Sequence, residues 1–159
     1  MTRPRYESPD DRRREREFYE RFNGVWDTHK IAKLPDNAFA DFAVCRANRV
    51  CVGVMEFKCR SFRWGAYPTV MISLLKAREV INIADAVGGR AWFAVQDSAG
   101  DVRIATLSAP FERVEYGGRT RKTRDAQDIE LVAHIRTIDF VPFDEWSPDG
   151  SLFASSRHG

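Results

Sequence analysis

Residues 53–60, with the sequence GVMEFKCR, carry the strongest structural signal in this chain. They end a run of alternating apolar residues and place Glu56 and Lys58 two positions apart. Successive side chains of a β-strand point to opposite faces, so these two charges share one face of the predicted strand. A surface ion pair would explain a carboxylate and an ammonium at a strand end, and so would a functional site.

The preceding segment, FADFAV, places Asp41 at the start of another predicted strand. A turn near Asn48 folds this strand back along residues 50–58, so Asp41 and Glu56 are predicted to meet at one end of a hairpin. Two neighbouring carboxylates repel each other, and a Mg²⁺ or Mn²⁺ ion bound by oxygen ligands removes that repulsion. Beside such an ion, Lys58 could orient a water molecule and stabilise charge on a phosphate. The hairpin therefore predicts a site for phosphodiester hydrolysis.

A helix is predicted over residues 8–24, SPDDRRREREFYERFNG. Ser8 suits the N-cap, Pro9 the first helical position and Asp11 the capping-box position. The Asn-Gly pair at the end of the segment is a typical stop signal.

One face of this helix combines aromatic residues with an acid. At about 100° per residue, Glu15 falls within the apolar face that Phe18 and Phe22 define, whereas Glu17 and Glu20 fall on the far side. A carboxylate on a buried face is costly unless it is compensated. A structural salt bridge could compensate it, and so could a metal ion shared with the two acids of the hairpin. The helix geometry selects Glu15 as the third acidic candidate.

The following patterns complete an α/β fold. Residues 67–89 are typical of a second helix, with Pro68 near its start and two glycines at its end. Later segments predict strands at 91–96, 101–107 and near 111–116, and a strand or short helix at 129–140. The predicted order, α-β-β-α-β-β, implies a mixed central sheet flanked by helices.

The length of 159 residues fits one domain, spanning 1–159. Its core is expected over about 8–142, followed by a polar tail over about 146–159.

The pattern Glu15…Asp41…Glu56-Phe57-Lys58, in this order of elements, resembles the PD-(D/E)XK nuclease superfamily. The spelling EREFYERF in the first helix is similar to that of the archaeal Holliday-junction resolvases within the superfamily. The chain also looks similar to small phage or prophage nucleases. The likeness extends from residue 8 to about residue 107.

The resemblance implies a restriction-endonuclease-like fold with an α-β-β-α-β core, and a DNA endonuclease whose cleavage leaves a 5′-phosphate. It assigns metal binding, with Mg²⁺ or Mn²⁺ as cofactor, to Asp41, Glu56, Phe57 and Glu15. It assigns catalysis to Asp41, Glu56, Lys58 and Glu15, with the lysine serving the attacking water. The alternative is a nucleic-acid-binding module that keeps the fold and does not cut; the intact acids and lysine favour the enzyme.

The sequence departs from the superfamily pattern in two places. Ala40 stands where the superfamily name has proline. No serine-glycine-serine segment of the resolvase kind precedes Asp41, which weighs against specificity for junctions. Selectivity for the structure of the DNA, such as a junction or another branch, is a further expectation from the resemblance.

The second predicted helix offers candidate DNA contacts. Lys76 lies among its apolar residues with Ser73 beside it, and the superfamily often places a polar residue of this helix beside the active site. Both are predicted phosphate contacts, although a lysine in this setting could instead extend its side chain to solvent. Before the helix, Trp64 and Tyr67 could stack on an unpaired base or pack in the core.

The segment YGGRTRKTRD, residues 116–125, is the other predicted DNA contact. Its glycines confer mobility, and four cations suit phosphate binding or a solvated loop; they are Arg119, Arg121, Lys122 and Arg124. The run RRRER at 12–16 has the same two interpretations, and the net charge of the chain is only +2.

Other classes of site are not indicated. No glycine-rich turn follows a predicted strand, which argues against dinucleotide and P-loop sites, and the three cysteines form no CxxC pair. The sequence shows no signal-peptide pattern and no apolar run of membrane-spanning length. We therefore expect a cytoplasmic protein, in the host cytoplasm if phage-encoded, with DNA and no membrane as its partner. A homodimer would suit symmetric cleavage of two strands.

Overall fold

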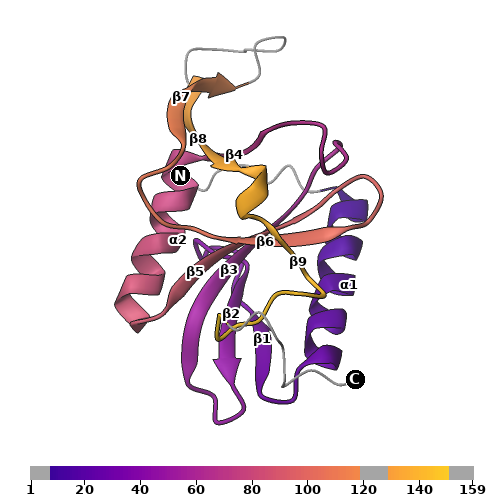
Figure 1. Cartoon of the computed structure of the whole chain (residues 1–159). Coiled ribbons are helices and arrows are strands. Elements are labelled where there is room, and N and C mark those ends of the chain that lie inside the picture. Colours follow the sequence, from indigo (N-terminus) through magenta and orange to yellow (C-terminus); the bar gives the residue numbers. More distant parts are fainter. Residues whose placement is uncertain (1–7, 119–128, 151–159) are drawn as a thin grey trace.

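The computed structural model describes residues 8–118 and 129–150 (Figure 1). In chain order its elements are α1 (Pro9–Val25), β1 (His29–Lys33), β2 (Phe42–Arg46), β3 (Cys51–Cys59), β4 (Thr69–Ser73), α2 (Leu74–Val87), β5 (Arg90–Gln96), β6 (Val102–Thr106), β7 (Arg113–Gly118), β8 (Ile129–Arg136), the 3-10 turn η2 (Thr137–Asp139) and β9 (Val141–Pro142).

The strands form two sheets. The larger sheet has six strands in the order β1-β2-β3-β5-β6-β9, and the smaller has three in the order β4-β8-β7. In the larger sheet β3 and β5 pair in parallel, with α2 in the connection between them, and the other neighbours pair antiparallel. The β7–β8 hairpin projects from the body of the molecule (Figure 1). The mixed sheet predicted from the sequence is confirmed.

The larger sheet is covered on both faces, with α1 and α2 on opposite sides (Figure 1). Alternate residues of β3 therefore enter different cores: Val54 packs in the α2 core, whereas Met55 and Phe57 pack in the α1 core. Glu56 belongs to the α2 side by the same alternation. Glu56 is therefore an acidic residue in a stretch of β3 whose apolar residues are buried in the two cores.

The N-terminus of α1 agrees with the prediction. Ser8 is the N-cap: its side chain accepts a hydrogen bond from the Asp11 amide, and the Asp11 carboxylate accepts one from the Ser8 amide. Both bonds satisfy amides that the first turn of a helix leaves open.

Three of the described strands were not predicted: β1, β4 and the two-residue β9. β1 was missed because His29–Lys33 offers only Ile31 and Ala32 as apolar residues. Residues 69–73 were assigned to the second helix but form β4, since Val70 and Ile72 are buried while Met71 between them is exposed. That period of two is typical of a strand, and the helix begins only after Ser73.

The C-terminal part of the described chain also contributes to packing. Phe143 and Trp146 are buried in the α1 core, where the Trp146 ring meets Trp26 and Trp92. The segment expected to be a polar tail therefore starts with a core tryptophan. None of the described helices is both long and apolar enough to cross a membrane.

Close packing of β3 against β5 gives the first testable prediction. A Cβ at Gly53 would lie 2.3 Å from the Arg90 carbonyl oxygen and 2.4 Å from the Trp92 ring. Gly53→Ala should lower the free energy of unfolding by about 2 kcal/mol or more, measured by urea denaturation. In the matched control, Gly24→Ala, the new methyl meets nothing within 4 Å in a helix, so stability should rise by up to about 1 kcal/mol. Equal urea midpoints for the two variants would contradict the close approach of β3 and β5 at Gly53.

Candidate active site

The site lies where β2 begins beside the second half of β3. Asp41 directly precedes β2, and its Oδ2 accepts a hydrogen bond of 2.8 Å from the Phe57 amide. The Asp41 amide in turn donates to the Met55 carbonyl at 3.1 Å. These two bonds fix the Asp41 carboxylate against β3, next to Glu56, as the hairpin pattern predicted.

Glu56 is a buried acid. Its side chain is only 1% exposed, and its Oε2 makes no hydrogen bond within the described residues. Two lysines lie near it: Lys58 Nζ is 3.7 Å from Oε1, and Lys76 Nζ is 3.4 Å from Oε2. Native proteins rarely leave a buried carboxylate oxygen without a hydrogen bond, so this oxygen is a candidate for ligand binding.

Burial and its neighbours change the acidity of Glu56. Loss of hydration is the largest effect and the negative charge of Asp41 is the next, and together they raise the pKa of Glu56 to about 8. The ammonium groups of Lys76 and Lys58 oppose this rise. A carboxylic acid that is protonated near neutral pH until a cation arrives is a frequent feature of functional sites.

The α1 side of the site contains a second set of charges. Glu15 faces inward, with a side chain 13% exposed, while Glu17 is exposed. Lys33 Nζ donates to Glu15 Oε1 and lies 3.6 Å from Asp41 Oδ1. The orientation deduced from the helix geometry is therefore observed, and the partner of Glu15 among the described contacts is a lysine.

Lys33 was not identified from the sequence because β1 was not predicted. The sequence signal that could have found it is the spacing of two between Ile31 and Lys33, which places both on one face of a strand. In the structure Ile31 is buried on that face. A lysine on the inner face of a strand requires a charged partner.

Six ionisable side chains form one connected group. Three acids and three lysines lie in contact, from Glu15 through Lys33, Asp41 and Glu56 to Lys58 and Lys76. Within residues 8–118 and 129–150, no group of three or more His, Cys, Asp or Glu side chains is placed to hold a metal ion. The donors that suit a divalent cation are the adjacent oxygens of Asp41 and Glu56, because carboxylates are the preferred ligands of Mg²⁺ and Mn²⁺.

The structure brings Lys76 to the site and gives Ser73 a structural role. Lys76 points to Glu56 from the first turn of α2. Ser73 is the N-cap of that helix, accepting from the Lys76 amide at 3.4 Å and donating to Glu130 Oε2 at 3.1 Å. A phosphate contact by Ser73 would have to replace its bond to Glu130.

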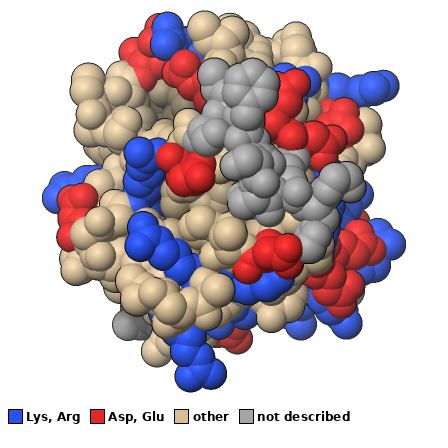
Figure 2. Space-filling view, turned by 60° about the horizontal axis from the view of Figure 1, so that its bottom comes forward, with Lys and Arg blue, Asp and Glu red and all other residues tan. Residues whose placement is uncertain are grey.

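The basic segments have different outcomes. The four cations predicted to contact DNA at 119–124 lie outside the described residues; they are Arg119, Arg121, Lys122 and Arg124. In the run at 12–16, Arg13 and Arg14 both form ion pairs with Asp10, which supports the solvated-surface interpretation. On the face shown in Figure 2, basic and acidic side chains lie intermixed, with no broad patch of one sign among the described residues.

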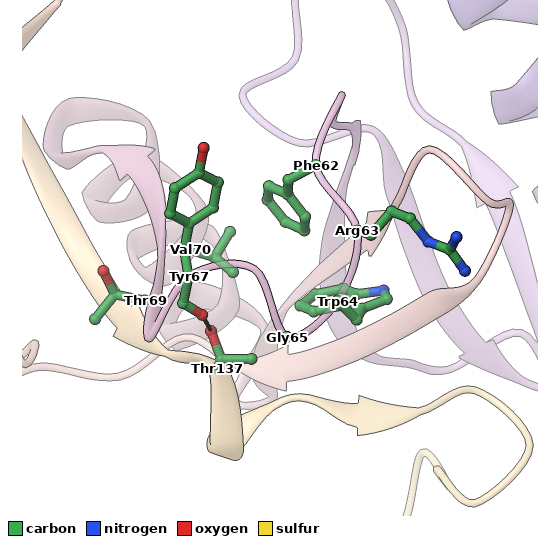
Figure 3. A pocket seen from close by; sticks show the side chains of 8 residues that line it. All are labelled: Phe62, Arg63, Trp64, Gly65, Tyr67, Thr69, Val70 and Thr137. Carbon is green, nitrogen blue, oxygen red and sulfur yellow. Dashed lines mark hydrogen bonds between the residues drawn. The ribbon is translucent and has the colours of Figure 1, made fainter.

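Aromatic residues line a shallow pocket in the loop that follows β3 (Figure 3). Trp64 packs edge-to-face or tilted against Phe62 and Phe140, and its indole N–H donates to a backbone carbonyl. Tyr67 is 62% exposed. Packing therefore accounts for Trp64, while the Tyr67 ring remains accessible.

The fold and this arrangement of charges define a protein of the PD-(D/E)XK nuclease type. A solved structure with the same fold is that of Hjc, a Holliday junction resolvase from the archaeal hyperthermophile Archaeoglobus fulgidus. The TM-score is 0.55 at 15% identity, over 86% of this chain and 93% of that chain. The family described as "Phage putative PDDEXK endonuclease" matches residues 1–143, and the chain belongs to this family. No curated protein matches it. The resemblance predicted from the sequence is confirmed.

The raised pKa of Glu56 predicts a pH-dependent stability. The native state binds a proton on Glu56 between its ordinary pKa of 4.5 and about 8, where the unfolded chain does not. Stability of the metal-free protein should therefore fall as pH rises through this window. Glu56→Gln cannot titrate, so it should gain at least about 1.4 kcal/mol relative to the wild type from pH 5 to pH 8, the equivalent of one pKa unit.

The measurement is urea unfolding in EDTA at a series of pH values. Glu17→Gln, which removes an exposed carboxylate from α1, is the matched control and should follow the wild-type curve. Parallel curves for Glu56→Gln and the wild type would show that Glu56 is ionised throughout.

Proposed function

We propose that this protein is a divalent-metal-dependent DNA endonuclease that hydrolyses phosphodiester bonds. The observation that carries the proposal is the buried Glu56 carboxylate, which lies beside Asp41 and has one oxygen without a hydrogen bond to any of the described residues. A purely structural acid in this position would need a full set of partners. Membership of the phage endonuclease family supports the same activity.

Asp41 and Glu56 would hold the ion, with Mg²⁺ or Mn²⁺ as the proposed cofactor. Bound there, the ion would acidify a water molecule and stabilise negative charge on the scissile phosphate. Phe57 already contributes its amide, which orients Asp41. Glu15 accepts a bond from Lys33 through Oε1, so we place it at the periphery of the ion.

Lys58 and Lys76 have distinct proposed roles. Lys58 lies at the exposed end of β3, with a side chain 40% exposed and Nζ close to Glu56, where it can orient the attacking water. Lys76 approaches the same carboxylate from α2 and can bind a phosphate oxygen from the other side. Cations aimed at the place where charge develops lower the barrier most.

For the substrate, we propose branched DNA as the first structure to test. The support is the fold shared with Hjc, a Holliday junction resolvase. Symmetric cleavage of a junction would further require two copies of the chain. The alternative, a module that binds nucleic acid without cutting, predicts binding to the same DNA and no products with any metal.

The carboxylates provide the direct test. Labelled junction, flap, duplex, single-stranded DNA and RNA are incubated with Mg²⁺, Mn²⁺ or EDTA. The wild type should cut at least one DNA substrate, and EDTA should stop cleavage. Asp41→Asn and Glu56→Gln should each lower the rate by about a hundredfold or more, because each removes a ligand charge. Glu17→Gln is the control and should cut normally. Cleavage by both active-site variants at the wild-type rate would refute the site assignment.

Lys58→Ala separates chemistry from binding. The rate of cleavage of bound DNA should fall by about a hundredfold or more, since the proposed contact acts on the attacking water. DNA affinity, measured by fluorescence anisotropy in EDTA, should change by less than about threefold, as for the loss of one charge among many contacts. A large loss of affinity with an unchanged single-turnover rate would instead assign Lys58 to DNA binding.

A further inference from the structure

Lys33 lies beside two of the carboxylates at the site. Its ammonium group bonds Glu15 and lies 3.6 Å from Asp41 Oδ1, a carboxylate proposed to hold the metal. The side chain is 40% exposed, and its Nζ lies over the Phe42 ring, 5.3 Å from the centroid. The ammonium group is therefore held by two carboxylates and an aromatic ring, at the end of a side chain that is partly exposed.

From this geometry we infer that Lys33 is an internal cation that competes with the divalent metal for Asp41 and Glu15, and so makes metal binding depend on bound DNA. The inference rests on the proposed function of the same site. Lys33 acts here as a positioning residue, because its role is exerted through the carboxylates.

The charge balance of the site supports competition. With at most three ionised acids facing three lysines, the site without metal has no net negative charge to attract a divalent ion. Entry of the ion would leave an excess of two positive charges within a few ångströms, and a DNA phosphate supplies the negative charge that offsets this excess. Metal and DNA should consequently strengthen each other's binding by the same factor.

The flexibility of Lys33 allows it to give way. A lysine ammonium is carried on four methylene groups, and in this partly exposed side chain it can turn from Asp41 toward solvent or toward a phosphate. Removal of Lys33 should therefore expose the repulsion among the acids in the metal-free protein and free their oxygens for the metal.

The test measures Mn²⁺ binding to DNA-free protein by isothermal titration calorimetry. Lys33→Gln should bind Mn²⁺ at least about fivefold more tightly than the wild type, because a nearby positive charge is lost. Its melting temperature in EDTA should be lower, and Mn²⁺ should raise that temperature more than it does in the wild type. Lys33→Arg keeps the charge and should retain wild-type Mn²⁺ affinity.

Arg78→Gln is the matched control, since Arg78 is an exposed cation on α2 and its removal changes the net charge equally. It should leave Mn²⁺ affinity unchanged. If Lys33→Gln folds poorly, Lys33→Met takes its place, because methionine keeps an unbranched apolar side chain beside Phe42.

The outcomes separate this inference from the proposed function. If the wild type cuts DNA and Lys33→Gln binds Mn²⁺ equally or more weakly, competition is refuted while the endonuclease stands. If the wild type neither binds Mn²⁺ nor cuts DNA, the proposed function and the inference both fail. In an uncut complex formed by Lys58→Ala, adding DNA should tighten Mn²⁺ binding, and the gain should shrink when Lys33→Gln is added.

Discussion

Burial of the Glu56 carboxylate next to Asp41 is the constraint on which the rest of the site depends. A single acid at 1% exposure is already costly to ionise, and a second acid beside it raises the cost. The protein responds in two ways: the pKa of Glu56 rises to about 8, and lysines approach from three separate elements. Each lysine lies close enough to a carboxylate to offset its charge.

The parallel pairing of β3 with β5 makes this burial possible. A parallel pair needs a crossover, and here α2 covers one face of the sheet while α1 covers the other. A strand in that position is dry on both sides, so a charge on it must meet charges from the helices. Lys76 of α2 pairs with Glu56, and Glu15 of α1 pairs with Lys33. Neither Lys76 nor Glu15 is near β3 in sequence. The topology of the fold, more than any local sequence motif, brings the residues of the site together.

The parts of the site that could be predicted from sequence are those with strong local signals. The hairpin that joins Asp41 to Glu56 follows from two alternating runs and a turn, and the orientation of Glu15 follows from helical periodicity. β4 was assigned wrongly because Val70 and Ile72 also fit the apolar stripes of the helix that follows, and only pairing with β8 decides between the periods. Lys33 could not be placed because its strand has too few apolar residues to show a period of its own.

The two interpretations of Glu15, a salt bridge or a metal ligand, turn out not to exclude each other. An acid that binds a metal still needs a counter-charge when the metal is absent. A neighbouring lysine supplies it, and neither charge is then buried without a partner. An ion pair such as Glu15–Lys33 is thus what a metal-free site of this kind should contain. The same argument applies to Glu56 with Lys76: the lysine offsets the carboxylate in the metal-free protein, and under the proposed function it would bind the phosphate that accompanies the ion. On that proposal, the structural and catalytic roles are successive states of one set of charges.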